Sequence, residues 1–235
     1  MSPQQSGYTL SHMDGLLPLL AKIAFWAPPV LAAVIFHELA HGYVAYRLGD
    51  PTAARLGRLT LNPLAHVDLF GTVLLPLMLI VSGSPFLFGY AKPVPVNFSN
   101  LRHPRRDMVY VAAAGPAMNL LLAVVSAFFL QQIQTSQFPG HLGATQPLQS
   151  STSIILVSML QVSVFINVAL AVFNLFPIPP LDGGRVATGL LPRGLALPLA
   201  RLEPYGMLIV IGLLMTGVLG DIVYPVTAFL VNVLL

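Results

Sequence analysis

The sequence contains no cysteine and very few charged residues. Its 235 residues include no Cys, and Asp, Glu, Lys and Arg together make up 8% of the chain. The first absence excludes disulfides, thiolate metal ligands and a cysteine nucleophile. The second excludes an ordinary soluble domain, in which about a quarter of the residues are charged. Because 56% of the residues are hydrophobic, we expect a lipid bilayer to form part of the solvent around this chain.

Strong positive charge, the usual mark of a nucleic-acid partner, is also missing. The formal net charge is only +3, and the Lys and Arg residues form neither a long run nor a dense face. We therefore expect no nucleic-acid partner. Anionic lipid headgroups account for a mild basic excess equally well.

Several stretches are long and apolar enough to cross a membrane, which takes about 20 residues in a helix. They are residues 22–46, 108–132 and 152–176. A further stretch, 206–235, forms one tilted helix or two short ones, because Gly217 and Pro225 interrupt it. We predict an all-α polytopic membrane protein. Its single membrane domain, 1–235, has a three-helix core within about 22–186 and one or more C-terminal membrane helices within about 206–235.

Two segments between these helices do not read as simple spans. Residues 70–90 are apolar but broken by two prolines and a glycine, which favours a re-entrant hairpin. Residues 91–96 read Ala-Lys-Pro-Val-Pro-Val, and a residue before proline disfavours helix, so we expect an extended, β-like segment. This segment either pairs with an unwound substrate strand, with Lys92, Val94 and Val96 as candidate binding residues, or is a proline-rich connector.

The strongest local pattern is His37-Glu38-Leu39-Ala40-His41. Two His residues at i and i+4 share a helix face, so both imidazoles can bind one metal ion. Zinc suits imidazole and lowers the pKa of bound water to roughly 7, and Glu38 is placed to accept a proton from that water. The pattern also occurs by chance in soluble helices. Here it lies in an apolar span, where ionisable groups are costly unless they face a partner or a cavity.

A third metal ligand is expected at similar membrane depth, because a catalytic zinc usually has three protein ligands and one open position. Asp182 is the best candidate. It follows the proline-rich end of the 152–176 helix, and irregular backbone at membrane depth is tolerated only inside protein or beside a water-filled cavity. The alternative is that Asp182 caps a helix that begins near Gly183.

His66 and Asp68 are spaced like a second metal pair. Residues of these types commonly hydrogen-bond to nearby backbone groups in loops. We favour this second interpretation for the pair.

Several motifs, taken together and in order, resemble the site-2 protease family of intramembrane zinc metalloproteases. His37-Glu38-Leu39-Ala40-His41-Gly42 resembles the first zinc motif of that family, and residues 174–184 resemble the second. Gly115-Pro116-Ala117-Met118-Asn119 resembles the element on the intervening core helix. Residues 57–63, 66–68 and 89–96 resemble stretches of the short, stand-alone members, which have no PDZ or CBS domain.

The resemblance implies a role for each matching residue. Three residues would bind one zinc ion per chain: His37, His41 and Asp182. Glu38 would be the general base. Asn174 would bind the substrate backbone or stabilise the oxyanion. Asn119 would either contact the substrate or hold helices together, as buried Asn residues in membranes commonly do.

The zinc ligands also constrain the topology. His41 and Asp182 can meet only if residues 70–90 dip into the membrane and return, because a full crossing would carry Asp182 to the opposite side. In that arrangement ten of the eleven Lys and Arg residues lie on the side of the site, and only Lys22 lies toward the other. The positive-inside rule then makes the site's side cytoplasmic. We expect a multi-pass cell-membrane protein with its active site near the cytoplasmic face.

These patterns predict an intramembrane zinc metalloendopeptidase that hydrolyses peptide bonds within or near transmembrane helices. Its partners would be transmembrane protein substrates, as in regulated intramembrane proteolysis. Two alternatives stay open at this point. One is a membrane metal-binding or transport protein that uses the same His and Asp residues without proteolysis. The other is an inactive relative that binds helices.

Overall fold

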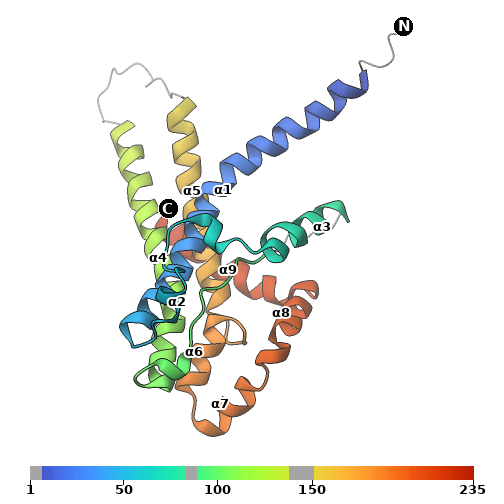
Figure 1. Cartoon of the computed structure of the whole chain (residues 1–235). Coiled ribbons are helices and arrows are strands. Elements are labelled where there is room, and N and C mark those ends of the chain that lie inside the picture. The colour runs from blue at the N-terminus through green and yellow to red at the C-terminus, as the bar shows by residue number, and fades with distance from the viewer. Residues whose placement is uncertain (1–6, 83–88, 138–150) are drawn as a thin grey trace.

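The computed structural model describes residues 7–82, 89–137 and 151–235. Within these ranges the chain consists of helices and loops, with no strand, so the predicted all-α architecture is confirmed (Figure 1). The longer helices are α1 (Gly7–Arg47), α4 (Pro104–Gln137), α5 (Ser151–Asn174), α8 (Gly206–Met215) and α9 (Val218–Leu234). The shorter elements are α2 (Thr52–Arg55), η2 (Pro63–His66), η3 (Leu69–Leu74), α3 (Leu75–Val81), η4 (Phe98–Asn100), α6 (Asp182–Leu190), α7 (Arg193–Ala200) and η5 (Glu203–Tyr205).

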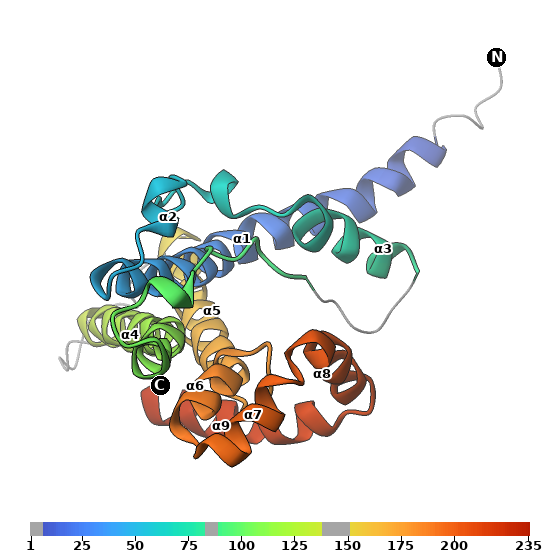
Figure 2. The same cartoon turned by 60° about the horizontal axis from the view of Figure 1, so that its bottom comes forward.

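Three helices, α1, α4 and α5, pack against one another and form the centre of the molecule (Figure 1). Small side chains let α4 and α5 approach closely, since Ala123 and Ala127 of α4 meet Val164 and Val168 of α5 in a fully packed cluster. This is how helices associate in lipid, where packing rather than exclusion of water holds them together. In Figure 2, α6 to α9 gather on one side of α5, and α1, α2 and α3 gather on the other.

Three helical stretches are long and apolar enough to cross a membrane: Pro104–Thr135, Ser153–Asn174 and Arg193–Met215. The first two contain most of the predicted spans 108–132 and 152–176. The third joins α7, η5 and α8 and was not predicted as one stretch. The predicted span 22–46 lies within α1, which is not among the three stretches found in the described residues. The 41 residues of α1 make a helix about 60 Å long, roughly twice the hydrocarbon thickness of a bilayer.

The C-terminal stretch 206–235 forms two helices, which decides between the two arrangements that the sequence left open. α8 ends at Met215 and α9 begins at Val218. Gly217 between them has φ of +80°, a left-handed conformation that glycine adopts without steric cost. α9 then returns to pack against α5.

The segment between α1 and α4 folds back on itself. The Tyr90 N–H donates to the Gly71 carbonyl over 3.0 Å, and the Thr72 hydroxyl donates to the Tyr90 carbonyl over 2.9 Å. Gly71 has to lack a side chain, because a Cβ there would collide with the Tyr90 ring. The beginning and the end of the predicted hairpin 70–90 therefore lie side by side, as a re-entrant segment requires.

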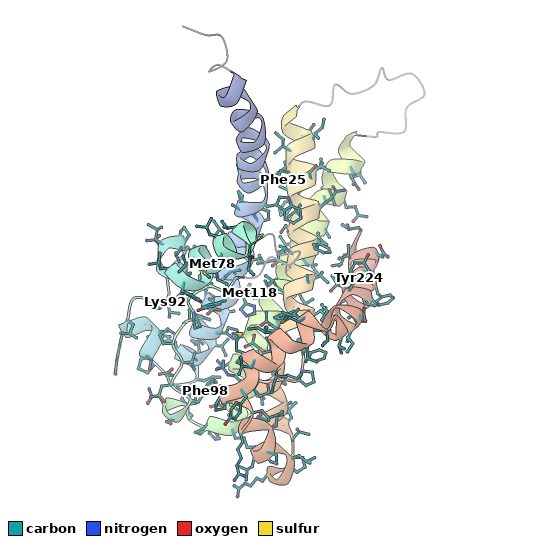
Figure 3. The ribbon with its side chains drawn as sticks, turned by 90° about the vertical axis from the view of Figure 1, so that its right-hand side faces the viewer. Phe25, Met78, Lys92, Phe98, Met118 and Tyr224 are labelled. Atoms are coloured by element: carbon teal, nitrogen blue, oxygen red, sulfur yellow. The ribbon has the colours of Figure 1, made fainter. Side chains whose placement is uncertain are left out.

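The level of this hairpin also fits a re-entrant segment. Figure 3 shows Met78 of α3 at nearly the same height along the bundle as Met118 in the middle of α4. α3 thus lies beside the apolar core helices and not beyond their ends. Gly83 and Pro85, two of the residues on which the hairpin prediction rested, lie outside the described residues.

Residues 89–97, which include the predicted extended stretch 91–96, form neither helix nor strand. The backbone is extended at Asn97, and the preceding loop is hydrogen-bonded to one edge of the segment. The Lys92 N–H donates to the His66 carbonyl over 2.9 Å. The Arg58 guanidinium donates to the carbonyls of Lys92 and Pro93 over 2.9 and 3.3 Å. The two prolines of the segment have no N–H, so a regular ladder of hydrogen bonds cannot form along it. This explains why an extended segment, and not a true strand, is found here.

Candidate metal centre

The two histidines of the helical motif and the distal aspartate lie together in the interior. His37 and His41 are one turn apart on α1, and their Nε2 atoms are 3.0 Å apart. The Asp182 Oδ2 atom lies 3.2 Å from each of these nitrogens. All three side chains are buried. One ligand atom from each lies within 4.8 Å of the other two, so a single metal ion can reach all three.

Asp182 reaches the histidines because a tight loop links α5 to α6. Gly183 and Gly184 follow Asp182, and a Cβ on either would collide with the loop backbone at Leu175 or Ile178. The first turn of α6 therefore packs directly on the loop. Leu181 occupies the N-cap position, and no side chain caps the helix. The Asp182 carboxylate is thus directed at the histidines and does not cap α6, in contrast to the alternative considered from the sequence.

The hydrogen bonds of the two imidazoles fix where their protons lie. His41 Nδ1 is 2.7 Å from the Val111 carbonyl, which can only accept, so this nitrogen carries the hydrogen. His37 Nδ1 lies 2.5 Å from the Asn119 Oδ1 atom and donates in the same way. Both Nε2 atoms then present lone pairs to each other and to Asp182.

Three electron-rich atoms therefore converge at one buried point. Asp182 Oδ2 is buried and makes no hydrogen bond, although an unpaired buried polar atom is costly. A cation bound between these atoms would offset their mutual repulsion, and it would give the Asp182 oxygen a partner. Two imidazole nitrogens and one carboxylate oxygen are a donor set that suits zinc and leaves a further coordination position open. The residues present fit a catalytic zinc ion.

Space for this group is made by Gly115 on α4. A Cβ at this position would collide with the ring nitrogens of His37 and His41. The glycine of the Gly-Pro-x-x-Asn element therefore allows α4 to lie directly against the two imidazoles.

The metal centre opens into a cavity of about 660 Å³ between the extended segment, α5 and α8. Glu38 lines it, and its Oε2 atom accepts a hydrogen bond from the Val94 N–H over 2.7 Å. Asn174 also lines the cavity, and its Nδ2 atom donates one bond to the Leu170 carbonyl over 2.9 Å. Val94 and Val96 line it as well.

Two of the candidate substrate-binding residues lie away from this cavity. The Lys92 side chain is exposed and does not line it, and Figure 3 shows Lys92 at the outer edge of the molecule. Asn119 is fully buried behind His37. Asn119 contacts His37 and does not line the cavity.

The favoured interpretation of His66 and Asp68 agrees with their contacts. His66 Nε2 bonds to the Thr60 carbonyl over 2.8 Å, and Asp68 accepts from the Gly71 N–H over 2.7 Å. Both side chains hold the local backbone of the loop.

Two further polar residues shape the site and were missed from the sequence. Asn167 of α5 is buried and its side chain is hydrogen-bonded to Asn119. An amide in the middle of an apolar span is the sequence feature that could have identified it. Asp50 accepts hydrogen bonds from Asn97, Asn100 and Thr52, and so ties the end of α1 to the extended segment. Burial raises the pKa of Asp50, but these hydrogen bonds outweigh it and hold the pKa below its usual value.

Comparison with known proteins gives consistent matches. The chain matches the family described as "Peptidase family M50" over residues 26–217. It is 37% identical over 206 residues to the Bacillus subtilis protein named "Putative zinc metalloprotease YwhC", covering 88% of this chain and 87% of that protein. It is 32% identical over 199 residues to "Putative zinc metalloprotease Rip2" of Mycolicibacterium smegmatis, covering 84% and 68%. No solved structure matches the chain.

A buried His-His-Asp group that could hold one metal ion lies among helices that are long and apolar enough to cross a membrane. The family match spans most of the chain and includes all three of these residues. The chain belongs to peptidase family M50, the site-2 protease family, and is a zinc metalloprotease.

Proposed function

We propose that this protein cleaves peptide bonds within or near the transmembrane helices of other membrane proteins, as in regulated intramembrane proteolysis. One observation carries the proposal: the possible ligands, Glu38 and the cavity lie together at the level of the apolar core helices. A metal transporter would carry ligands along a path through several helices. Among the described residues, His37, His41 and Asp182 are the one such group found.

His37, His41 and Asp182 are proposed to hold one zinc ion. When bound, zinc supplies a Lewis acid that polarises the scissile carbonyl and acidifies water. The Nδ1 partners and Gly115 hold the two imidazoles in place, so that their Nε2 atoms and the Asp182 carboxylate face one point.

Glu38 is proposed as the general base. Its carboxylate faces the cavity beside the metal centre, where it takes a proton from the attacking water and gives it to the leaving amine. The Val94 N–H binds one carboxylate oxygen. The other oxygen is proposed to accept the proton of that water.

The cavity also supplies contacts for an unwound substrate. Val94 and Val96 present the extended segment to it, so a substrate strand can lie alongside by edge pairing. The Asn174 amide donates one hydrogen bond to the Leu170 carbonyl of its own helix. Its second hydrogen is proposed to bind a substrate carbonyl or the developing oxyanion.

The site is proposed to face the cytoplasm. Figure 1 shows the end of α1, the start of α4, α6 and α7 at the same end of the bundle. Most of the basic residues belong to these elements and to the loops beside them: Arg47, Arg55, Arg58, Arg102, Arg105, Arg106, Arg185, Arg193 and Arg201. The positive-inside rule assigns this end to the cytoplasm.

Glu38→Gln tests the proposal. Glutamine keeps the size of glutamate but cannot accept the proton, so cleavage of a co-reconstituted single-span protein should fall by about 10²–10⁴-fold while zinc content stays stoichiometric. The matched control is Asp221→Asn, which makes the same carboxylate-to-amide change at an exposed residue of α9 that does not line the cavity, and this variant should cleave normally. Wild-type cleavage by zinc-loaded Glu38→Gln would overturn the mechanism.

A further inference from the structure

A chain of hydrogen bonds runs from His37 through two buried amides and joins all three core helices. The Asn119 Nδ2 atom on α4 donates to the Ala33 carbonyl on α1 over 3.1 Å and to the Asn167 Oδ1 atom on α5 over 2.8 Å. The Asn167 Nδ2 atom donates to the Ser163 carbonyl over 2.9 Å. Asn119 and Asn167 are 0% and 1% exposed, so water cannot replace these partners.

The two backbone carbonyls give this chain one direction. A carbonyl only accepts, so the Ser163 carbonyl requires the nitrogen of the Asn167 amide on its side. The Asn167 oxygen must then face Asn119. With acceptors at both Asn167 and Ala33, the Asn119 nitrogen uses both its hydrogens there, and its oxygen is turned toward His37.

The final step sets the tautomer of His37. Facing an oxygen, His37 Nδ1 must carry the hydrogen, which leaves the Nε2 lone pair directed at His41 and Asp182. If the Asn119 amide turned over, its N–H would face Nδ1 and favour the tautomer with the hydrogen on Nε2. That tautomer cannot bind a metal through Nε2.

We propose that Asn167 is a positioning residue for the metal: through Asn119 it holds His37 in the tautomer that binds zinc. The proposal rests on the ligand role of His37 given above. Polar partners of metal-bound histidines act in this way in soluble sites, where they fix the ring and its tautomer. Here the determining group, Asn167, lies on a different helix from His37 and reaches it through the Asn119 side chain.

A second, partly buried polar contact between α4 and α5 can be used to distinguish this role from plain helix pairing. The hydroxyls of Ser126 and Ser163 are 2.8 Å apart and join α4 to α5. The Asn167 Nδ2 atom also donates to the Ser163 hydroxyl over 3.3 Å, but neither serine is hydrogen-bonded to Asn119 or His37. If the amides only hold α4 and α5 together, losing this hydroxyl pair should have the same kind of effect as losing Asn167.

The experiment measures zinc affinity by competition with a chelator of known strength, and the melting temperature, in the full-length protein in detergent. Asn167→Leu should weaken zinc about 10-fold, the lower end of the 10–100-fold range for partners of metal ligands. Asn167→Asp, in its protonated form, offers one acceptor to Asn119 and one donor to Ser163 and should restore most of the affinity. Ser126→Ala should leave zinc affinity unchanged.

A double-variant comparison shows whether Asn167 acts through Asn119. In the Asn119→Leu background, Asn167→Leu should cause no further loss of zinc affinity. Asn167→Ala is measured in parallel, so that poor folding of the larger leucine does not decide the result. Unchanged zinc affinity in a folded variant without the amide, or an equal loss in both backgrounds, would overturn the proposal. Wild-type zinc binding by His37→Ala would instead show that the ligand role of His37 itself is wrong.

Discussion

Gly115 shows how strongly the metal centre depends on a single position without a side chain. The imidazoles of His37 and His41 lie where its Cβ would be, so α4 can approach α1 only with glycine here. We expect Gly115→Ala to lower the zinc content and to destabilise the fold by about 1–3 kcal/mol, the usual cost of overpacking. Zinc analysis and thermal unfolding of the purified variant measure both effects.

The matched control for this substitution is Gly212→Ala in α8. An added Cβ there meets no atom within 4 Å, and alanine is the better helix former by about 0.5–1 kcal/mol. Its zinc content and melting temperature should not fall. If Gly115→Ala behaves like Gly212→Ala, the close contact between α4 and the two imidazoles is not required for metal binding.

At the scale of residues, the sequence indicated groups that act through their own spacing. His37 and His41 share a helix face in any α-helix, so their proximity followed from the spacing of i and i+4. The N–H of Val94 on Glu38 and the amide of Asn167 behind Asn119 could not be foreseen in the same way. The first contact depends on how the extended segment lies against α1, and the second on how α4 and α5 are rotated against each other. No local pattern specifies either arrangement.

At the scale of elements, the hairpin 70–90 between α1 and α4 determines on which side of the membrane the neighbouring segments lie. Its two ends are joined at Gly71 and Tyr90, so the loop before it and the extended segment after it should lie on one side of the membrane. We expect single cysteines at Ala54 and Ser99 to react with an impermeant thiol reagent from the same, cytoplasmic side. The chain has no cysteine of its own, so the background is clean. Labelling from opposite sides would contradict the re-entrant arrangement.

The helices of the core were predictable because a bilayer sets a minimum length that α4 and α5 plainly meet. The stretch Arg193–Met215 was not predicted as one unit. Pro198 lies inside α7, and Arg193 and Arg201 flank that helix, features that locally indicate a loop. α7 packs against α6, and the start of α8 packs on the loop at Pro179 and Pro180. A pattern of apolar residues does not reveal these contacts.

For the whole molecule, zinc should link the two halves of the chain and stabilise both. A ligand that binds only the folded state at 100 times its Kd adds about 2.7 kcal/mol to the free energy of unfolding. Chelation should therefore lower the melting temperature of the wild type. His41→Ala, which lacks a ligand, should melt lower and respond little to the chelator. His103→Ala, which changes an exposed histidine outside the site, should respond like the wild type.

The joining of α1 to α6 at one point also bears on how the protein is made. During synthesis at the membrane, the His pair leaves the ribosome early, and Asp182 emerges only after α4 and α5. A nascent chain that has formed only α1 therefore carries two of the three proposed ligands. The order of the motifs along the chain means that the proposed metal centre can be completed only after α4 and α5 have been made.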